Sequence, residues 1–324
     1  MALAVLAFSA WNAGAQSCQT ASDLDEATQS AISAAAQRYF DMAAKGDAAS
    51  LRQNANASLI ADFSGIEATV KDHQPELAAA QSNVKSSFLL EAEGPAPLAH
   101  AEFYCGVFGK NGQTSGSAVF YLDNLPPGKY AVVLLEVTSA KVRANFSMVL
   151  QQSGTDWKLG GLYIKPAQIA GHDSAWFAAR AREYKTKGQL HNTWWFYLQA
   201  RSLISPLPFM VTLATDKLYD EFQGAQPADV PTEGKTADLF AGTATYKLTA
   251  IFPEAVGDDL DLVVKYQSAD ASKADQAYQT NVAVIKALVA KYPEVREAFA
   301  AVVARAVDNS GRDYGTLLSM KDIK

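Results

Sequence analysis

Residues 130–164 read YAVVLLEVTSAKVRANFSMVLQQSGTDWKLGGLYI, and this stretch decides the fold. It contains runs rich in β-branched and aromatic residues, with Ser153-Gly154 as a turn signal before the last of them. Similar runs precede it, separated by Gly94-Pro95, Asn111-Gly112 and Pro126-Pro127-Gly128. The six runs are 84–91, 101–108, 116–123, 130–138, 142–151 and 157–164. Their spacing predicts an antiparallel meander.

Helical patterns come before these strands. Within residues 28–45, Ala31, Ile32, Ala35, Tyr39 and Met42 recur at helical spacing, and Gly46-Asp47 ends the pattern. Shorter helices are expected at 48–53 and 59–71. Helices followed by a run of strands predict an α+β class, with a curved antiparallel sheet packed on the opening helices.

The helix ending in Lys45-Gly46-Asp47, the meander and the strand DWKLGGLY at 156–163 together resemble the nuclear transport factor two-like superfamily, also called ketosteroid isomerase-like. The resemblance covers residues 25–165. It implies a cone-shaped sheet whose mouth holds a small ligand in some members, whereas many members are catalytically inert. The fold therefore leaves the function open.

A helical hairpin is expected next, at 171–206. Residues 173–206 resemble one tetratricopeptide-type repeat, and a single repeat must dock on its neighbours. Trp194, Trp195, Phe196 and Tyr197 are consecutive, so on a helix they point all around the axis. We expect this helix to be enclosed between two domains. The alternative is that Trp194 or Trp195 forms an exposed binding surface.

Residues 207–324 predict a second α+β domain. Extended runs at 209–213, 243–252, 260–267 and 314–320 accompany a short helix at 215–222. Tyr278, Val282, Ile285 and Val289 mark a helix face, and Val295, Phe299, Val302 and Ala306 repeat the same offsets after Pro293. The second domain is therefore expected to end in two amphipathic helices. The predicted organisation is a cone-shaped α+β domain at 16–170, a helical hairpin connector at 171–206 and a second α+β domain at 207–324.

Composition limits the class of protein. The chain has 324 residues, of which 49% are apolar and 19% charged, so it is long enough for about two domains and is not expected to be disordered. The net charge of −6 disfavours a nucleic-acid partner.

The N-terminus predicts export. Residues 2–11 are apolar and Ala13-Gly14-Ala15 resembles a cleavage site, so residues 1–15 are expected to be a signal peptide and the protein to be secreted or periplasmic. The alternative is an apolar tail that stays attached. No further apolar stretch is long enough to cross a membrane, so no integral membrane segment is expected. Cys18 and Cys105 are disulfide candidates in such a compartment, or two unpaired small apolar residues.

No motif for catalysis, metal binding or a cofactor stands out. The four histidines are isolated, and nucleotide-binding and serine-hydrolase patterns are absent, so no catalytic residue, metal or cofactor is assigned. Carboxylates at 254, 258, 259 and 261 are expected to be solvated turn residues rather than a calcium site. If the cone were catalytic, the candidates within reach on the helices and early strands would be Tyr39, Asp62, His73 and Tyr104, although a surface or packing role is expected for each.

These observations favour a secreted or periplasmic non-enzymatic protein that binds a small ligand or a protein partner. The candidate binding residues are Tyr39, His73, Tyr104, Trp194 and Trp195. One alternative is a small-molecule isomerase or hydrolase that uses the cone pocket. A second is an assembly scaffold that uses the aromatic hairpin.

Overall fold

The computed structural model describes residues 16–110, 112–139 and 143–324. The expected signal peptide at 1–15 lies outside these residues. The chain has an α+β fold and forms two compact units. The first comprises the chain up to Pro166 together with Ser205–Leu213, and the second comprises Ala167–Ile204 with Ala214–Lys324. Among the described helices, none has the length and apolar character needed to cross a membrane.

The first unit opens with β1 and a set of helices whose starts are capped by side chains. Asp25, Asp47 and Asn56 each accept a hydrogen bond from a main-chain N–H three residues later, at 2.8–2.9 Å. The helices are α1 (Glu26–Ala44), α2 (Ala48–Gln53), α3 (Ala57–Ala61) and α4 (Ser64–Leu77). The expected helices at 28–45 and 48–53 are thereby confirmed, and the pattern at 59–71 divides between α3 and α4.

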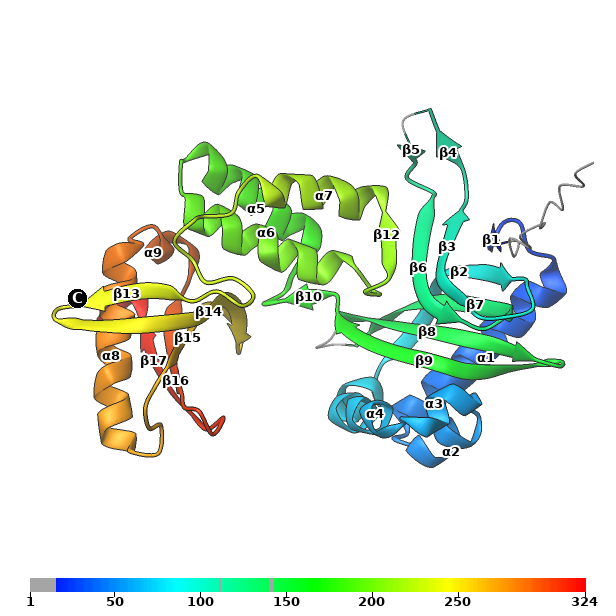
Figure 1. Cartoon of the computed structure of the whole chain (residues 1–324), viewed down its shortest axis with the longest axis horizontal. Helices are drawn as coiled ribbons and strands as arrows, with labels where there is room; N and C mark the ends of the chain where they lie inside the picture. Colours follow the sequence, from blue (N-terminus) through cyan, green and yellow to red (C-terminus); the bar gives the residue numbers. More distant parts are fainter. Residues whose placement is uncertain (1–15, 111, 140–142) are drawn as a thin grey trace, which may run out of the picture. The chain divides into compact units, whose positions relative to one another are not determined.

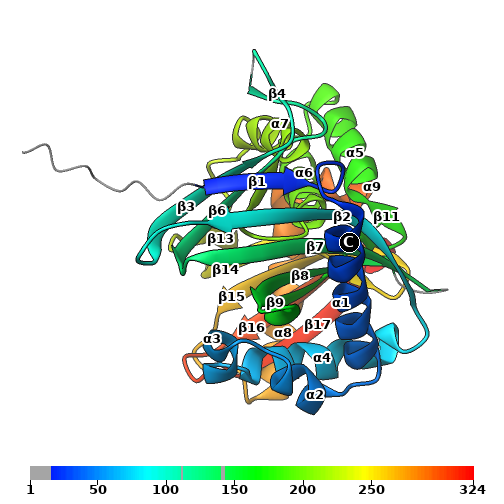
Figure 2. The same ribbon diagram turned by 90° about the vertical axis from the view of Figure 1, so that its right-hand side faces the viewer.

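The helices cover one face of an antiparallel five-stranded sheet with the order β1-β2-β7-β8-β9. Its strands are β1 (Gln16–Thr20), β2 (Gln81–Ala92), β7 (Gly128–Thr138), β8 (Arg143–Ser153) and β9 (Asp156–Pro166). Figure 2 shows this order and α1 running across the strands. Buried side chains fill the space between the two layers, including Tyr39, Phe40, Phe146 and Leu150. The helix face of the sheet is therefore a packed core.

A second sheet covers the opposite face. It has the order β12-β6-β3 and consists of β3 (Leu98–Cys105), β6 (Ala118–Leu125) and β12 (Met210–Thr212). The short hairpin of β4 (Phe108–Gly109) and β5 (Gly112–Gln113) lies between β3 and β6 in the chain. Phe88 of β2 packs against Phe120 of β6 at 5.0 Å between ring centroids, and both belong to one core formed by the two sheets.

The six predicted runs are all strands, but the expectation of one continuous meander is corrected. Four of the runs pair in the first sheet, whereas β3 and β6 pair with each other and with β12. The chain changes sheet at two proline-containing loops, after Ala92 and after Leu125. Proline lacks an N–H and interrupts strand pairing, so each loop separates the ladders.

The second unit begins with a short strand pair and a helical hairpin. These elements are β10 (Gln168–Ile169), β11 (His172–Asp173), α5 (Ser174–Thr186) and α6 (Leu190–Ile204), and α7 (Leu213–Gln223) follows β12. The expected hairpin is present. It shares one hydrophobic core with the C-terminal sheet and therefore groups with the second unit rather than forming a connector of its own. The run at 209–213, expected in the second domain, contributes β12 to the first unit instead.

The C-terminal sheet has the order β13-β14-β15-β16-β17. Its strands are β13 (Ala237–Ala241), β14 (Ala244–Val256), β15 (Asp259–Gln267), β16 (Ala301–Val307) and β17 (Asp313–Ser319), and the 3-10 helix Met320–Asp322 follows. β15 and β16 are parallel, and α8 (Ala274–Lys291) with the one-turn α9 (Val295–Ala298) connects them. The helix packs on one face of the sheet.

The prediction of a second long C-terminal helix is wrong. Only Val295–Ala298 is helical, and Ala301–Val307 forms β16. The segment AVVARAV is rich in valine and lies between two neighbouring strands, where β-branched side chains pack well. Tertiary pairing therefore outweighs the helical spacing of its apolar residues.

Candidate functional site

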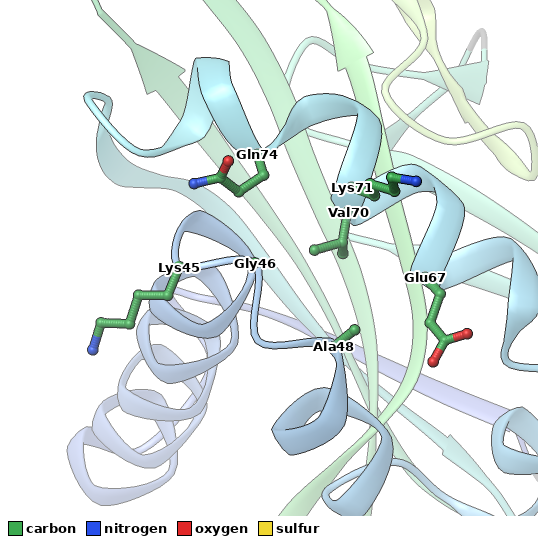
Figure 3. A pocket seen from close by; sticks show the side chains of 7 residues that line it. All are labelled: Lys45, Gly46, Ala48, Glu67, Val70, Lys71 and Gln74. Atoms are coloured by element: carbon green, nitrogen blue, oxygen red, sulfur yellow. The ribbon is translucent and has the colours of Figure 1, made fainter.

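A cleft of about 360 Å³ opens in the first unit where α1, α2 and α4 meet. This is within the size range of small-ligand sites. The side chains that surround it are drawn in Figure 3: Lys45, Gly46, Ala48, Glu67, Val70, Lys71 and Gln74. We call it the α1–α4 cleft.

Local sequence explains why the cleft exists. Gly46 has a positive φ of 70°, which lets the chain turn sharply between α1 and α2. A Cβ at this position would lie 3.1 Å from Cγ of Gln74, so glycine also permits α4 to approach closely. The Gln74 amide nitrogen lies 3.4 Å from the Ala44 carbonyl oxygen and donates to it. These contacts hold the turn against α4.

The cleft combines an apolar floor with charged edges. Val70 is buried and faces Ala48 across the middle of the cleft in Figure 3, while Lys45 and Lys71 extend outward on either side. Within the part of the chain that the structure describes, neither lysine forms an ion pair. The Glu67 carboxylate also lines the cleft, so its charged edge carries two cations and one anion. Two lysines beside a small apolar floor suit a ligand with an anionic group and a short apolar portion.

Tyr39, one of the predicted binding residues, is fully buried in the helix–sheet core. Its hydroxyl lies 2.8 Å from the Trp157 carbonyl oxygen and 3.0 Å from that of Asn54. Burial raises the pKa of Tyr39. Its role in the structure is to connect α1 with β9.

His73 and Tyr104 lie on other surfaces. His73 is on α4, where Nδ1 is 3.3 Å from the Glu76 carboxylate. Tyr104 is on β3 and is 56% exposed, and its hydroxyl donates to Glu102 at 2.7 Å. This hydrogen bond to Glu102 raises the pKa of Tyr104. The structure therefore does not bring Tyr39, His73 and Tyr104 together into one site.

Trp194 and Trp195 are core residues of the second unit. The Trp194 ring stacks on Phe222 with centroids 4.0 Å apart, and Trp195 contacts Tyr292 and Phe299 edge-on at 5.9 and 6.1 Å. Trp195 has no exposed surface. The expectation that they lie between two domains is corrected, because these partners all belong to α7, α8, α9 and their junctions in the second unit. Burial of both rings removes the basis for a scaffold surface on this helix.

The predicted turn lies between β14 and β15, and Glu254, Asp258 and Asp259 are exposed there, but the expectation that all four carboxylates are solvated is wrong for Asp261, which is on β15 and only 2% exposed. Glu254 and Asp261 face each other across these strands, and Asp258 lies in the turn. Over the described ranges of the chain, no group of three or more His, Cys, Asp or Glu side chains has a geometry that could hold a metal ion.

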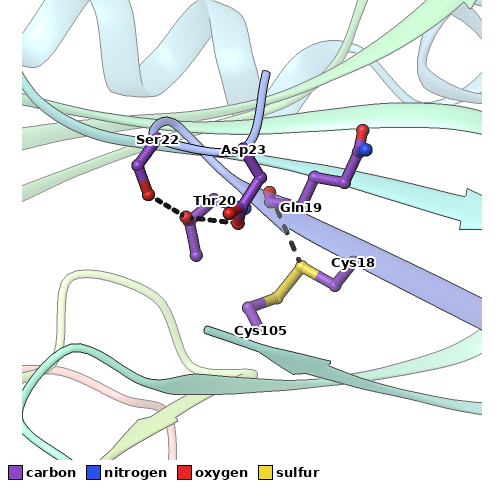
Figure 4. Close-up of a disulfide and its surroundings, with 6 residues drawn as sticks. All are labelled: Cys18, Gln19, Thr20, Ser22, Asp23 and Cys105. Carbon is purple, nitrogen blue, oxygen red and sulfur yellow. Dashed lines mark hydrogen bonds between the residues drawn. A yellow bond between two sulfur atoms is a disulfide. The ribbon is translucent and has the colours of Figure 1, made fainter. Parts of the chain in front are cut away.

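Cys18 and Cys105 form a disulfide between β1 and β3, with their Cα atoms 5.0 Å apart. Figure 4 shows the bond beside a turn in which the Thr20 hydroxyl donates to Asp23 at 2.6 Å and Ser22 lies close to Thr20. The Glu102 main-chain N–H also donates to the Gln16 side chain at 2.8 Å. β1 is thereby attached to both sheets of the first unit.

Comparison with known proteins identifies no family model, curated protein or solved structure that matches this chain. Sequence reasoning missed the α1–α4 cleft, because its lining comes from two segments that are separated by about twenty residues and meet only after folding. The one available signal was Gly46, which was interpreted only as the end of a helix.

Proposed function

We propose that this protein is an extracytoplasmic, non-enzymatic binding protein whose ligand site is the α1–α4 cleft. The ligand class is a small organic anion with a short apolar portion. The observation that carries the proposal is the cleft itself, in which two lysines without ion-pair partners among the described residues flank the apolar floor of Val70 and Ala48.

The disulfide supports the compartment. Structural disulfides persist in secreted and periplasmic proteins and are rare where thiols are kept reduced. The apolar segment at 2–11 and Ala13-Gly14-Ala15 agree with export through a cleaved signal. Mass spectrometry of the exported protein is expected to find a chain that begins at Gln16 and gains two hydrogens on reduction. A cytoplasmic chain with free thiols would contradict this part of the proposal.

The packed interior argues against the alternative of an isomerase or hydrolase in the cone. The helix face of the five-stranded sheet is filled by buried side chains such as Tyr39 and Phe146, and the other face by Phe88 and Phe120. An acid or base at the bottom of a cone pocket would need that space. The resemblance of residues 25–165 to nuclear transport factor two-like proteins, and that of 173–206 to a tetratricopeptide repeat, stay predictions.

Titration calorimetry with straight-chain carboxylates from acetate to octanoate tests the ligand class. Each added methylene that contacts the floor is expected to raise affinity about fourfold, corresponding to about 0.8 kcal/mol, until the floor is covered. Lys45→Ala and Lys71→Ala are each expected to weaken binding about two- to fivefold.

Lys217→Ala is the matched control, because Lys217 is an exposed lysine on α7 in the second unit. It should leave binding unchanged. Absence of binding across the carboxylate series, or equal losses from Lys217→Ala and Lys71→Ala, would refute the assignment of the cleft.

A further inference from the structure

The C-terminal sheet has one face covered by helix and one face without a helix. Leu262, Val264 and Tyr266 of β15 belong to the core beneath α8. Side chains alternate along a strand, so Asp261, Val263 and Lys265 lie on the opposite face. Figure 1 shows α8 on one side of β13 to β17. We call the opposite side the open face.

A continuous apolar row crosses the open face. Phe252 of β14 is paired with Val263 of β15, Val263 with Val303 of β16, and Val303 with Leu317 of β17. Leu317 is 47% exposed, and Phe252 and Val303 are half-buried. Val263 is buried by its neighbours but belongs to none of the described hydrophobic cores. Two further exposed apolar residues lie away from the row, Val256 at the β14–β15 turn and Phe240 on β13 opposite Thr245 at the other end of β14.

Carboxylates lie along one side of this row. Glu254 and Asp261 are directly opposite each other on β14 and β15. Like charges in such a pair are destabilising. Asp261 is 98% buried, its Oδ1 has no hydrogen-bond partner, and desolvation raises its pKa. Glu254 takes part in none of the ion pairs formed by the described residues. The acidic pair therefore lacks a cation from its own chain.

Cations lie along the other side of the row. Lys265 of β15 is paired with Arg305 of β16, two residues along each strand from Val263 and Val303. Lys265 Nζ lies 5.5 Å from the centroid of the Phe252 ring, and Arg305 forms an ion pair with Asp313. On β15 the open face thus runs from acidic Asp261 through apolar Val263 to basic Lys265, and Arg305 extends the basic side onto β16. On β17 the carboxylate on this side is Asp313, which is ion-paired with Arg305.

We propose that the open face is a self-association surface, occupied by the same face of a second copy of this chain. Consider a twofold axis that lies between the two faces and runs parallel to the apolar row. It places the apolar row of one copy on that of the other, and it places the acidic side of each copy opposite the basic side of its partner. Glu254, which is exposed, then faces the cationic side of the other copy, which Lys265 and Arg305 supply, while Asp261 lies beneath the surface and adds its charge from there. The alternative axis, parallel to the strands, opposes acid with acid. Charge complementarity therefore selects one arrangement, and it supplies the cations that the acidic pair lacks.

The size of the surface predicts a weak dimer. Four strands about 4.8 Å apart, each with about five contributing residues, give a face of roughly 19 by 17 Å. This corresponds to about 320 Å² per copy, or about 650 Å² for the pair, which is below the roughly 1,200 Å² total of stable interfaces, so only weak and transient association is expected. We expect a dissociation constant of about 10–500 µM.

Sedimentation velocity of the full chain over a concentration series measures this association. Glu254→Lys and Lys265→Glu are each expected to weaken it about tenfold or more, because each places like charges across the axis. An equimolar mixture of the two variants is expected to regain association, since every pair across the mixed dimer is again complementary. Added salt should weaken the wild-type dimer.

Asp275→Lys and Lys286→Glu are the matched controls, since both residues are exposed on α8 on the other side of the sheet. They should leave the dissociation constant unchanged. Leu317→Glu, at an exposed position on the edge strand, gives an independent disruption if a reversal variant does not fold by circular dichroism. A chain that is monomeric up to about 1 mM, reversals that have no effect, or a mixture that regains nothing would each overturn the proposal.

Discussion

The Tyr39 hydroxyl lies 2.8 Å from the main-chain oxygen of Trp157, and this contact joins α1 to β9 in the core of the first unit. Both groups are buried, so the carbonyl has no water to replace the hydroxyl.

Tyr39→Phe is therefore expected to lower the free energy of unfolding by about 1 kcal/mol, because it removes the shorter of two side-chain hydrogen bonds to this buried oxygen and leaves the 3.4 Å bond from Arg38 Nη2. Urea denaturation monitored by circular dichroism measures the change. Tyr121→Phe is the control, because Tyr121 is 46% exposed and its hydroxyl can bond to water. Equal effects of the two substitutions would show that the Tyr39 hydroxyl contributes nothing specific.

Replacing Cys18 and Cys105 together by serine is expected to lower the free energy of unfolding by about 2–5 kcal/mol. The disulfide closes a separation of 87 residues, and its loss restores the conformational freedom of that loop in the unfolded chain. Guanidinium denaturation of the oxidised protein, the reduced protein and the double variant gives the comparison. The reductant should destabilise the wild type and leave the variant unaffected.

Trp195→Ala is expected to cost about 3–5 kcal/mol, since a fully buried indole leaves a large cavity. Trp195→Phe should cost less than about 2 kcal/mol, because the indole Nε1 has no hydrogen-bond partner to lose and an aromatic ring is retained. Thermal and urea unfolding of both variants test this. A loss below about 1 kcal/mol for the alanine variant would contradict the burial of this ring.

The hydrogen bonds of Asp308 lead us to expect that part of the stability of the second unit is lost in acid. Its carboxylate accepts hydrogen bonds from the Ser310 hydroxyl at 2.6 Å, the Ser310 N–H at 2.9 Å and Arg312 Nε at 3.1 Å. These bonds, that from the Ser310 side chain first, hold the pKa of Asp308 well below its usual range. A carboxyl whose pKa is lower in the folded state stabilises the protein above its unfolded pKa, about 3.9, and this contribution is lost as the pH falls through the folded pKa.

Asp308→Asn is therefore expected to be destabilised most at neutral pH, with the difference from wild type shrinking as the pH falls below about 4. Denaturant unfolding at several pH values between 3 and 7 measures this difference. Asp275→Asn, at an exposed position, should follow the wild-type curve. A gap between Asp308→Asn and wild type that stays constant with pH would contradict the lowered pKa.

Gly46→Ala tests the turn beside the cleft. The positive φ and the 3.1 Å approach to Gln74 both oppose a side chain, so a loss of about 1 kcal/mol or more in the free energy of unfolding is expected. In the double variant Gly46→Ala/Gln74→Ala, the part of the stability loss that comes from contact with the Gln74 side chain should be recovered. The part that comes from the positive φ should remain. No recovery would assign the whole cost to the backbone.

Local sequence patterns were sufficient to predict most of the helices and strands. Apolar spacing predicted the helix at 28–45, and α1 spans Glu26–Ala44. Alternating and β-branched runs predicted the strands that became β2, β3 and β6 to β9. These elements are encoded by residues close in sequence, where side-chain period and turn residues are informative.

Pairing between distant segments could not be predicted in the same way. β12 pairs with β6, about ninety residues earlier, and β16 forms where the apolar offsets fit a helix. The α1–α4 cleft depends on the approach of Gln74 to Gly46, which is a tertiary contact. Trp195 was correctly expected to be buried, but its partners Tyr292 and Phe299 lie about a hundred residues further along the chain.

The path of the chain through β12 has a consequence for biosynthesis. Met210–Thr212 completes the three-stranded sheet of the first unit, although α5 and α6 precede it and belong to the second. A ribosome or an export channel delivers the chain from its N-terminus, so the sheet must wait for its outermost strand until both helices have emerged. We therefore expect the two units to complete folding in overlapping rather than successive order. Cleavage of the polypeptide at a single site cannot release either unit intact.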